Sequence, residues 1–275
     1  MNKDYTRYTI KTGSDEESNI LIATLSDWGI EGFEEADGLL YASGLSNEIE
    51  ENGIESFLHS RNIGFTKQII PDQNWNKVWE SNFEPVQVGG FVGIRAAFHP
   101  PMPGVSHEIL ITPKMSFGTG HHATTYLVME LMENFDFKNK SVFDFGTGTG
   151  ILAILAEKLG AGNILAVDYD DWCILNATEN IEQNACRNIS IEQADKAPAG
   201  IDFDFVIANI NKNIILENLT QLVSNLSPGG KLILSGLLTT DEDDIVSAAS
   251  KLGFTNPGIR EKNGWIALFF AKSSV

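Results

Sequence analysis

The chain has few of the residues that mark secreted, metal-binding or membrane-spanning proteins. Its 275 residues include two cysteines, Cys173 and Cys186, which supply neither a disulfide framework nor a metal-ligand spacing. No apolar run reaches the length of a membrane span, and the first twenty residues are too polar for a signal peptide. These absences predict a cytoplasmic protein without metal or membrane contact, and we expect it to act as a monomer.

Basic residues are also scarce. The sequence holds 19 Lys and Arg against 37 Asp and Glu, a net charge of −18. Direct binding to nucleic acid is therefore not expected, because proteins that bind it present a basic face. An acidic surface would attract a basic protein substrate, although acidity that serves only solubility explains the composition equally well.

The most informative stretch is residues 141–168. A short apolar strand ends in a turn that contains Gly146, Gly148 and Gly150. An amphipathic helix follows, and then a second strand that closes on Asp168. This order of strand, glycine turn, helix, strand and acid is typical of a nucleotide-binding half-unit, in which the acid accepts ribose hydroxyls.

The glycine spacing narrows the choice of nucleotide ligand. A dinucleotide fingerprint, G-x-G-x-x-G, would need a glycine where Ile151 stands. The observed pattern, an acid followed by G-x-G-x-G, resembles the first motif of S-adenosylmethionine-dependent methyltransferases of the Rossmann-like class. A glycine turn without a ligand is the alternative, and Asp168 argues against it because it lies where a ribose acid is needed.

Three regions separate along the chain. Residues 1–70 alternate as strand, helix, strand, strand, helix and strand, which predicts a ferredoxin-like α+β domain. We assign it to substrate recognition, with a purely structural appendage as the alternative. Residues 71–110 read as a linker with a short helix carrying Trp75 and Trp79 and a hairpin over 86–97. Residues 111–275 contain the glycine motif and form the methyltransferase domain.

The third region predicts an α/β fold of the Rossmann-like methyltransferase type. Further strands are expected at 189–193, 203–209 and 231–234, with helices at 216–226 and 241–252. Two last strands within 254–271 read as a C-terminal hairpin. The result is a mostly parallel seven-stranded sheet that ends in an antiparallel hairpin, which dehydrogenases of the doubly wound type lack.

A second glycine-rich loop precedes the first strand of this domain, at 117–125, and leads into a helix over 125–132. Thr124 and Thr125 are suited to cap that helix, or the loop closes over a cofactor. The adjacent His121 and His122 suggest a metal at first sight. No cysteine or acid stands at ligand spacing beside them, so a zinc site is rejected.

Several motifs together make the chain resemble the PrmA family, the methyltransferases of the large-subunit ribosomal protein eleven. The matching segments are FGTGHHATT at 117–125, DFGTGTGILAI at 144–154, ANI at 208–210, SPGG at 227–230 and SGLL at 235–238. The resemblance covers nearly the whole chain, including the first domain and the tryptophan helix. Where the family has a threonine and a proline, this chain has His121 and Ala123.

The resemblance implies a cofactor, a substrate and site residues. It implies S-adenosyl-L-methionine as cofactor, and lysine side chains and the N-terminal α-amino group of ribosomal protein eleven as methyl acceptors. The residues that match the family's cofactor contacts are Thr125, Gly146, Asp168 and Asn209.

Chemical reasoning from the residues adds five assignments, each with an alternative. Gly148 is the closest backbone approach to the ligand, or only a turn residue. Asp144 anchors the methionine ammonium, or caps the next helix. Asp195 accepts from the adenine amine, or is a surface acid. Asn209 accepts a hydrogen bond from the substrate amine and aims its lone pair, or simply ends a strand. His122 is the one candidate for a general base by residue type, and a scaffolding role in the loop explains it as well.

Two other functions stay open. One is a methyltransferase of the same fold that acts on a release-factor glutamine or on a small molecule. An enzyme that methylates the glutamine would show N-P-P-Y after the fourth strand, but this chain has Asn209-Ile210-Asn211-Lys212. A non-catalytic binding protein would not need the intact glycine motif, Asp168 and Asn209.

Overall fold

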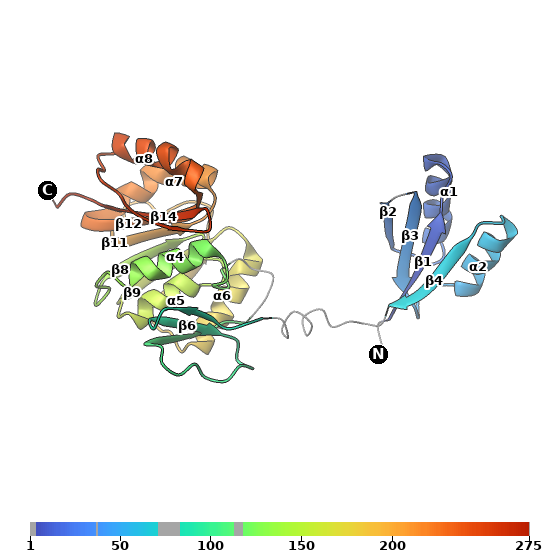
Figure 1. The fold of residues 1–275 in the computed structure, drawn as a ribbon, viewed down its shortest axis with the longest axis horizontal. Coiled ribbons are helices and arrows are strands. Elements are labelled where there is room, and N and C mark those ends of the chain that lie inside the picture. Colours follow the sequence, from blue (N-terminus) through green and yellow to red (C-terminus); the bar gives the residue numbers. More distant parts are fainter. Residues whose placement is uncertain (1–3, 37, 71–82, 113–117, 275) are drawn as a thin grey trace. The chain divides into compact units, whose positions relative to one another are not determined.

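The computed structural model describes residues 4–36, 38–70, 83–112 and 118–274. The chain forms two compact units, Met1–Asn82 and Phe83–Val275, which Figure 1 draws in colours that follow the sequence. The predicted helix with Trp75 and Trp79 lies outside the described residues, as does Phe117 at the start of the second glycine-rich loop.

The first unit is a four-stranded antiparallel sheet in the order β2-β3-β1-β4, and it carries two helices. Its elements are β1 (Tyr5–Lys11), α1 (Asp15–Ser26), β2 (Gly32–Ala36), β3 (Leu39–Leu45), α2 (Glu51–Ser60) and β4 (Phe65–Ile70). This order and topology confirm the predicted ferredoxin-like domain. Alternate residues of β1, among them Tyr8 and Ile10, are fully buried, and with Leu25, Ile54 and Leu58 they form a core of their own.

The second unit is built on a seven-stranded sheet in the order β10-β9-β8-β11-β12-β14-β13. Its elements are β5 (Val86–Val88), β6 (Val92–Arg95), β7 (His107–Leu110), α4 (Ala123–Met132), β8 (Ser141–Phe145), α5 (Ile151–Lys158), β9 (Asn163–Asp168), α6 (Asp171–Gln183), β10 (Ile189–Gln193), β11 (Phe203–Asn209), α7 (Lys212–Ser224), β12 (Leu226–Leu238), the 3-10 turn η1 (Thr239–Asp241), α8 (Glu242–Lys251), β13 (Gly258–Lys262) and β14 (Trp265–Ala271). The first five strands of that order are parallel, and β14 pairs antiparallel with both neighbours. The predicted Rossmann-like fold with a C-terminal hairpin is confirmed.

Alternation along the strands divides the interior of this sheet into two cores. On β11, Ile207 packs in one core with α4 and α5 residues, whereas Val206 and Ala208 pack in the other with α7 and α8 residues. Neighbouring side chains of a strand point to opposite faces, so both faces of the sheet are covered. In the central strands β8, β9 and β11, polar residues stand only within two positions of a strand end, and the site lies at the carboxyl ends of these strands.

A small three-stranded sheet, β5-β6-β7, belongs to the second unit. Its first two strands are the predicted hairpin, turning at Gly89 and Gly90. The third strand, β7, runs parallel to β6 and was not predicted. The predicted linker range 71–110 is therefore divided, with 83–110 in the second unit.

Several element boundaries differ from the prediction by a few residues, and two of these differences have identifiable reasons. Helix α7 was predicted from residue 216, but it begins at Lys212 because the side chain of Asn211 accepts a hydrogen bond from Ile214 N and caps it. Strand β12 extends from Leu226 rather than Lys231, because the SPGG segment continues the strand through an irregularity in its pairing with β11.

Candidate functional site

The register of three parallel strands gathers the predicted site at one edge of the sheet. Phe145 of β8 is paired with Val167 of β9 and with Ala208 of β11. The residues that follow these three along the chain are Gly146, Asp168 and Asn209. Ligands of open parallel sheets bind at this carboxyl edge, so the structure brings the glycine turn, the acid and the asparagine together.

Asp168 holds the glycine turn in place. Its Oδ2 accepts a hydrogen bond from Gly148 N at 2.9 Å, and its Oδ1 accepts one from Asp170 N at 3.1 Å. The side chain is 6% exposed. A carboxylate oxygen can accept two hydrogen bonds, so each oxygen of Asp168 keeps one acceptor position for a ligand hydroxyl.

The glycine turn follows the end of β8 closely. Gly146 N and Thr147 N both donate to Val167 O at 2.9 Å, which folds the chain back over β9. Gly146 has φ of 76°, and a Cβ there would stand 2.3 Å from Ile210 Cγ2. A side chain at this position would be strained and would collide. The turn thus requires glycine at 146 and packs it against the ANI segment.

Asp144 is a buried carboxylate with spare hydrogen-bonding capacity. Its Oδ2 accepts from Thr147 Oγ1 at 2.6 Å, while its Oδ1 has no hydrogen-bond partner among the described residues. Burial raises the pKa of Asp144 from 3.8 to about 6; the charge of Asp168 raises it too, and the Thr147 hydrogen bond lowers it. The nearby backbone N–H of Ala153, in the first turn of α5, lowers this pKa slightly as well. A cation bound beside Oδ1 would satisfy it.

Replacing Asp144 by asparagine is expected to remove part of the pH dependence of stability. Because the folded carboxyl group has a pKa of about 6 instead of 3.8, it keeps a proton in the folded state that the unfolded state has lost. This contribution to stability is complete at low pH and is lost as pH rises to about 6. Between those limits the wild type should lose about 2–3 kcal/mol of unfolding free energy relative to the variant. Denaturant titrations of both proteins across this pH range measure it, and a constant difference would contradict it.

Asn209 and Thr125 form the second polar pair of the site. Asn209 Nδ2 donates to Thr125 Oγ1 at 3.2 Å, and both residues are buried, Thr125 completely. Asn209 Oδ1 has no hydrogen-bond partner in the described part of the chain. Leaving a buried polar atom unpaired costs about 1–3 kcal/mol, so a ligand that donates a hydrogen bond to this oxygen would recover that free energy.

Two residues that sequence reasoning missed connect the glycine turn to the second loop. Thr149 Oγ1 donates to Gly118 O at 2.6 Å. Asn180, fully buried on α6, donates to Thr149 O at 2.9 Å and accepts from Thr112 N at 2.8 Å. The available signal was a row of asparagines at helical spacing on the core-facing side of α6, Asn176, Asn180 and Asn184.

The two histidines of the second loop have structural partners. His121 Nε2 donates to Glu84 O at 2.9 Å, and its ring packs edge-on against Phe83, so it ties the loop to the start of the second unit. His122, not Thr124 or Thr125 as predicted, caps α4, because its ring accepts a hydrogen bond from Thr124 N. Both threonines are instead buried within the first turn.

The environment of His122 favours its neutral form. Burial lowers the pKa of the imidazole, and the ring packs edge-on against Trp265 with 4.5 Å between centroids. A neutral imidazole could accept a proton, but its Nδ1 is engaged with Thr124 at the start of α4. These contacts support the scaffolding interpretation.

Asp195 is exposed and lies beside the edge of the sheet that carries Asp168. The connection is a backbone hydrogen bond from Ala194 N to Asp168 O at 2.9 Å. The position is thus suited to contact with a ligand that binds at Asp168 and reaches beyond it.

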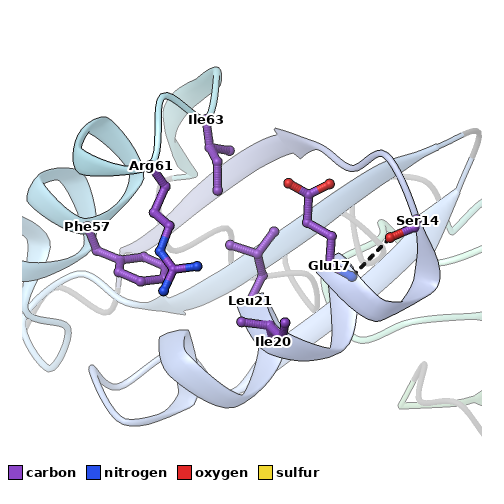
Figure 2. Close-up of a pocket in the computed structure, with 7 residues that line it drawn as sticks. All are labelled: Ser14, Glu17, Ile20, Leu21, Phe57, Arg61 and Ile63. Carbon is purple, nitrogen blue, oxygen red and sulfur yellow. Dashed lines mark hydrogen bonds between the residues drawn. The ribbon is translucent and has the colours of Figure 1, made fainter.

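A separate hollow lies in the first unit between α1 and the end of α2, with a volume of about 290 Å³. Figure 2 shows Glu17 on one side of it and Arg61, stacked over Phe57, on the other. Its lining is Ser14, Glu17, Ile20, Leu21, Phe57, Arg61 and Ile63. An apolar floor with two opposite charges at the rim is suited to binding a peptide side chain and offers no reactive pair.

Within the described ranges, the structure shows no cluster of three or more His, Cys, Asp or Glu side chains that could hold a metal ion. No helix in the same ranges is both long and apolar enough to cross a membrane.

The arrangement at the carboxyl edge selects a particular ligand chemistry. Among the described residues, Asp144 and Asp168 have no ion pair with Lys or Arg. The available groups are thus two carboxylates and one amide oxygen, all acceptors. They fit a ligand that brings hydroxyl donors and positive charge, as the predicted ribose-bearing sulfonium with its ammonium group does.

Comparisons with known proteins agree with the interpretation of the chain as a methyltransferase. Residues 32–273 match the family described as Ribosomal protein L11 methyltransferase (PrmA). A ribosomal protein L11 methyltransferase of Porphyromonas gingivalis is 39% identical over 97% of this chain and 93% of that protein. One of Bacteroides thetaiotaomicron is 38% identical over 97% of this chain and 99% of its own length. The crystal structure of a ribosomal protein L11 methylase from Lactobacillus delbrueckii subsp. bulgaricus is similar with a TM-score of 0.65 and 30% identity, covering 70% of this chain and 100% of that one.

Proposed function

The chain belongs to the ribosomal protein L11 methyltransferase family, and on that basis we propose that it transfers methyl groups from S-adenosylmethionine to ribosomal protein L11. The acceptors are lysine side chains and the N-terminal α-amino group. The observation that carries the proposal is the alignment of Gly146, Asp168 and Asn209 at one sheet edge. The acceptor atoms of Asp144 and Asn209 beside them, which no donor from the described ranges reaches, support it.

Each residue of the site has a role in holding the cofactor. Asp168 accepts the ribose hydroxyls with the acceptor positions that Gly148 N and Asp170 N leave open. Asp144 Oδ1 receives the methionine ammonium, and this charge pair lowers the raised pKa of the carboxyl group. Gly146 and Gly148 let the backbone approach the ligand, Thr125 contacts it, and Asp195 accepts from the adenine amine.

The remaining requirement is a neutral amine with its lone pair aimed at the methyl group. When bound, S-adenosylmethionine supplies a methyl group on a cationic sulfur, which an amine displaces in line. A lysine amine has an ordinary pKa of about 10.4 and an α-amino group about 7.7–8.0, and burial lowers both. Asn209 Oδ1 accepts an N–H of the amine, and Thr125 fixes the amide so that Oδ1 stays available. Most of the rate enhancement then comes from alignment and from exclusion of water.

No side chain is required as a base in this scheme. An amine that reaches the site from water can lose its proton before it is enclosed. His122 then serves as the cap of α4, and through α4 it positions Thr125.

Replacing Asn209 by alanine is expected to lower kcat by about 100-fold, the effect of removing a well-placed polar group that acts in the transition state. Affinity for S-adenosylmethionine should change by less than about fivefold, since Asp168 and the glycine turn are untouched. The matched control is Asn211→Ala, which removes the α7 cap and costs about 1 kcal/mol of stability but leaves kcat near the wild-type value. Single-turnover methylation and calorimetry measure both quantities. Equal kcat in the Asn209 variant and the wild type would contradict the assigned role.

The first unit supplies recognition of the substrate protein. It has its own core, and residues 1–70 contain thirteen acids against five Lys and Arg, which favours a basic partner. The hollow between α1 and α2 provides an apolar contact point on this unit. The same acidic balance argues against direct nucleic-acid binding, and a ribosomal-protein substrate places the reaction in the cytoplasm.

Incubation of the purified protein with ribosomal protein L11 and methyl-labelled S-adenosylmethionine tests the proposal. Peptide mass analysis should find label on lysines and on the N-terminal amine. Label on a release-factor glutamine or a small molecule, with none on ribosomal protein L11, would overturn the substrate assignment. Failure to bind the cofactor in calorimetry would overturn the enzymatic function itself.

A further inference from the structure

Large, unusually exposed side chains stand just before and in the first turns of helix α6. Tyr169, Trp172 and Leu175 are 76%, 71% and 63% exposed, the three highest values for large hydrophobic residues in the described chain. Single exposed apolar residues are common, but a group of them in one place marks an interaction site. Trp172 and Leu175 are three positions apart and lie on the solvent side of α6.

Acidic residues accompany the two apolar ones on that side. The buried face of α6 consists of Asn176, Ala177, Asn180 and Ile181. At 100° per residue, the opposite side carries Asp171, Trp172, Leu175 and Glu182, and all four are exposed. We call these four residues the α6 strip. Tyr169 is kept out of it because it adjoins the ribose carboxylate.

The strip is held rigidly next to the reactive edge. Asp170 Oδ1 accepts from Trp172 N at 2.9 Å and caps α6, while Asp170 N donates to Asp168 Oδ1. The edge strand β10 adds a hydrogen bond from Gln193 Nε2 to Tyr169 O at 3.0 Å. The strip therefore starts three residues after the carboxylate assigned to the ribose, and its backbone is fixed to that carboxylate through Asp170.

From these observations we infer that the α6 strip binds a lysine- or arginine-bearing segment of the protein substrate, next to the amine that is methylated. The inference rests on the proposed function. An indole face attracts a Lys or Arg cation, tryptophan is enriched among residues that dominate interface affinity, and Asp171 and Glu182 add the complementary charge. A net charge of −18 on the whole chain favours such a cationic partner. Nucleic acid would be repelled by the same acids.

The test compares two double variants, each of which replaces one exposed apolar residue by alanine and one exposed aspartate by asparagine. Asp171→Asn/Trp172→Ala alters the strip. Ile201→Ala/Asp202→Asn alters an exposed apolar and acidic pair just before β11, hence at the opposite edge of the sheet. For the strip variant we expect the KM for ribosomal protein L11 at low salt to rise about tenfold. The kcat and the calorimetric Kd for S-adenosylmethionine should stay within about twofold, and the control variant should match the wild type in all three.

A variant that introduces a positive charge gives a second measurement that does not depend on shortening a side chain. Trp172→Lys should raise the KM at low salt by more than at high salt, because repulsion of a cationic segment is screened by ions. An unchanged KM in both strip variants, or an equal rise in the control, would overturn the inference while leaving the function intact. Absence of any turnover of ribosomal protein L11 by the wild type would overturn the proposed function, and the inference with it.

Discussion

Replacing Gly148 by aspartate is expected to weaken binding of S-adenosylmethionine at least about 100-fold, which corresponds to about 2.7 kcal/mol. Gly148 has φ of 56°, and its N–H donates to Asp168 Oδ2 at 2.9 Å. A carboxylate on this residue would stand close to the carboxylate of Asp168 and compete for the same ligand positions. Two like charges in a buried site resist joint ionisation. Isothermal calorimetry at neutral pH measures the loss.

The matched control is Gly148→Asn, which has nearly the same size and no charge. Asparagine and aspartate are the side chains that tolerate positive φ best, so both variants should fold, as circular dichroism would confirm. We expect the asparagine variant to lose about tenfold or less in affinity, from bulk alone. Wild-type affinity in the aspartate variant would refute the placement of the cofactor at the glycine turn. Equal loss in both variants would assign the effect to size rather than to charge.

Removal of Met1–Asn82 is expected to abolish methylation of ribosomal protein L11 without changing affinity for S-adenosylmethionine by more than about twofold. The reason is that the two units have separate cores: one contains residues 8–65, and the other two contain residues 86–270. The proposed cofactor residues all belong to the second unit. Calorimetry on the truncated protein and a methylation assay with labelled cofactor measure the two properties.

The isolated first unit provides the control for this experiment. If residues 1–82 bind the substrate protein, adding them in excess should inhibit methylation by the full-length chain. Phe57 lines the hollow between α1 and α2. If this hollow contributes to binding, the isolated unit with Phe57→Ala should inhibit methylation less than the unchanged unit. Turnover by the truncated enzyme at the full-length rate would end the assignment of recognition to the first unit.

The parts of the fold that could be predicted are those whose signal is local. Strands β1, β10 and β11 have the predicted bounds. Their signals are local: alternating apolar and polar residues in β1 and β10, and a short apolar run in β11. Strand β7 escaped prediction because its partners are distant. It pairs in parallel with β6, and its free side is bonded by the side chain of Asn184, 74 residues away from Leu110.

The residues of the candidate site likewise fall into those that could be predicted from local sequence and those that could not. Gly146, Asp168 and Asn209 could be found because each ends a strand, and the edge of a parallel sheet brings such residues together. Thr149 and Asn180 could not, since their contacts join segments 31 and 68 residues apart. The capping role of His122 was missed because serine, threonine, asparagine and aspartate are the usual caps, and two threonines stood nearby.

A directed-evolution campaign that selects this protein for heat resistance alone would tend to produce inactive descendants. Among the residues that the structure describes, no donor reaches the buried Asp144 Oδ1 or Asn209 Oδ1. An apolar side chain of similar volume at position 144, such as leucine, therefore removes a desolvated carboxylate. The same replacement removes the carboxylate that we propose as the anchor for the methionine ammonium. Screening libraries in the presence of S-adenosylmethionine would reverse this bias, because ligand binding then stabilises the variants that keep both oxygens.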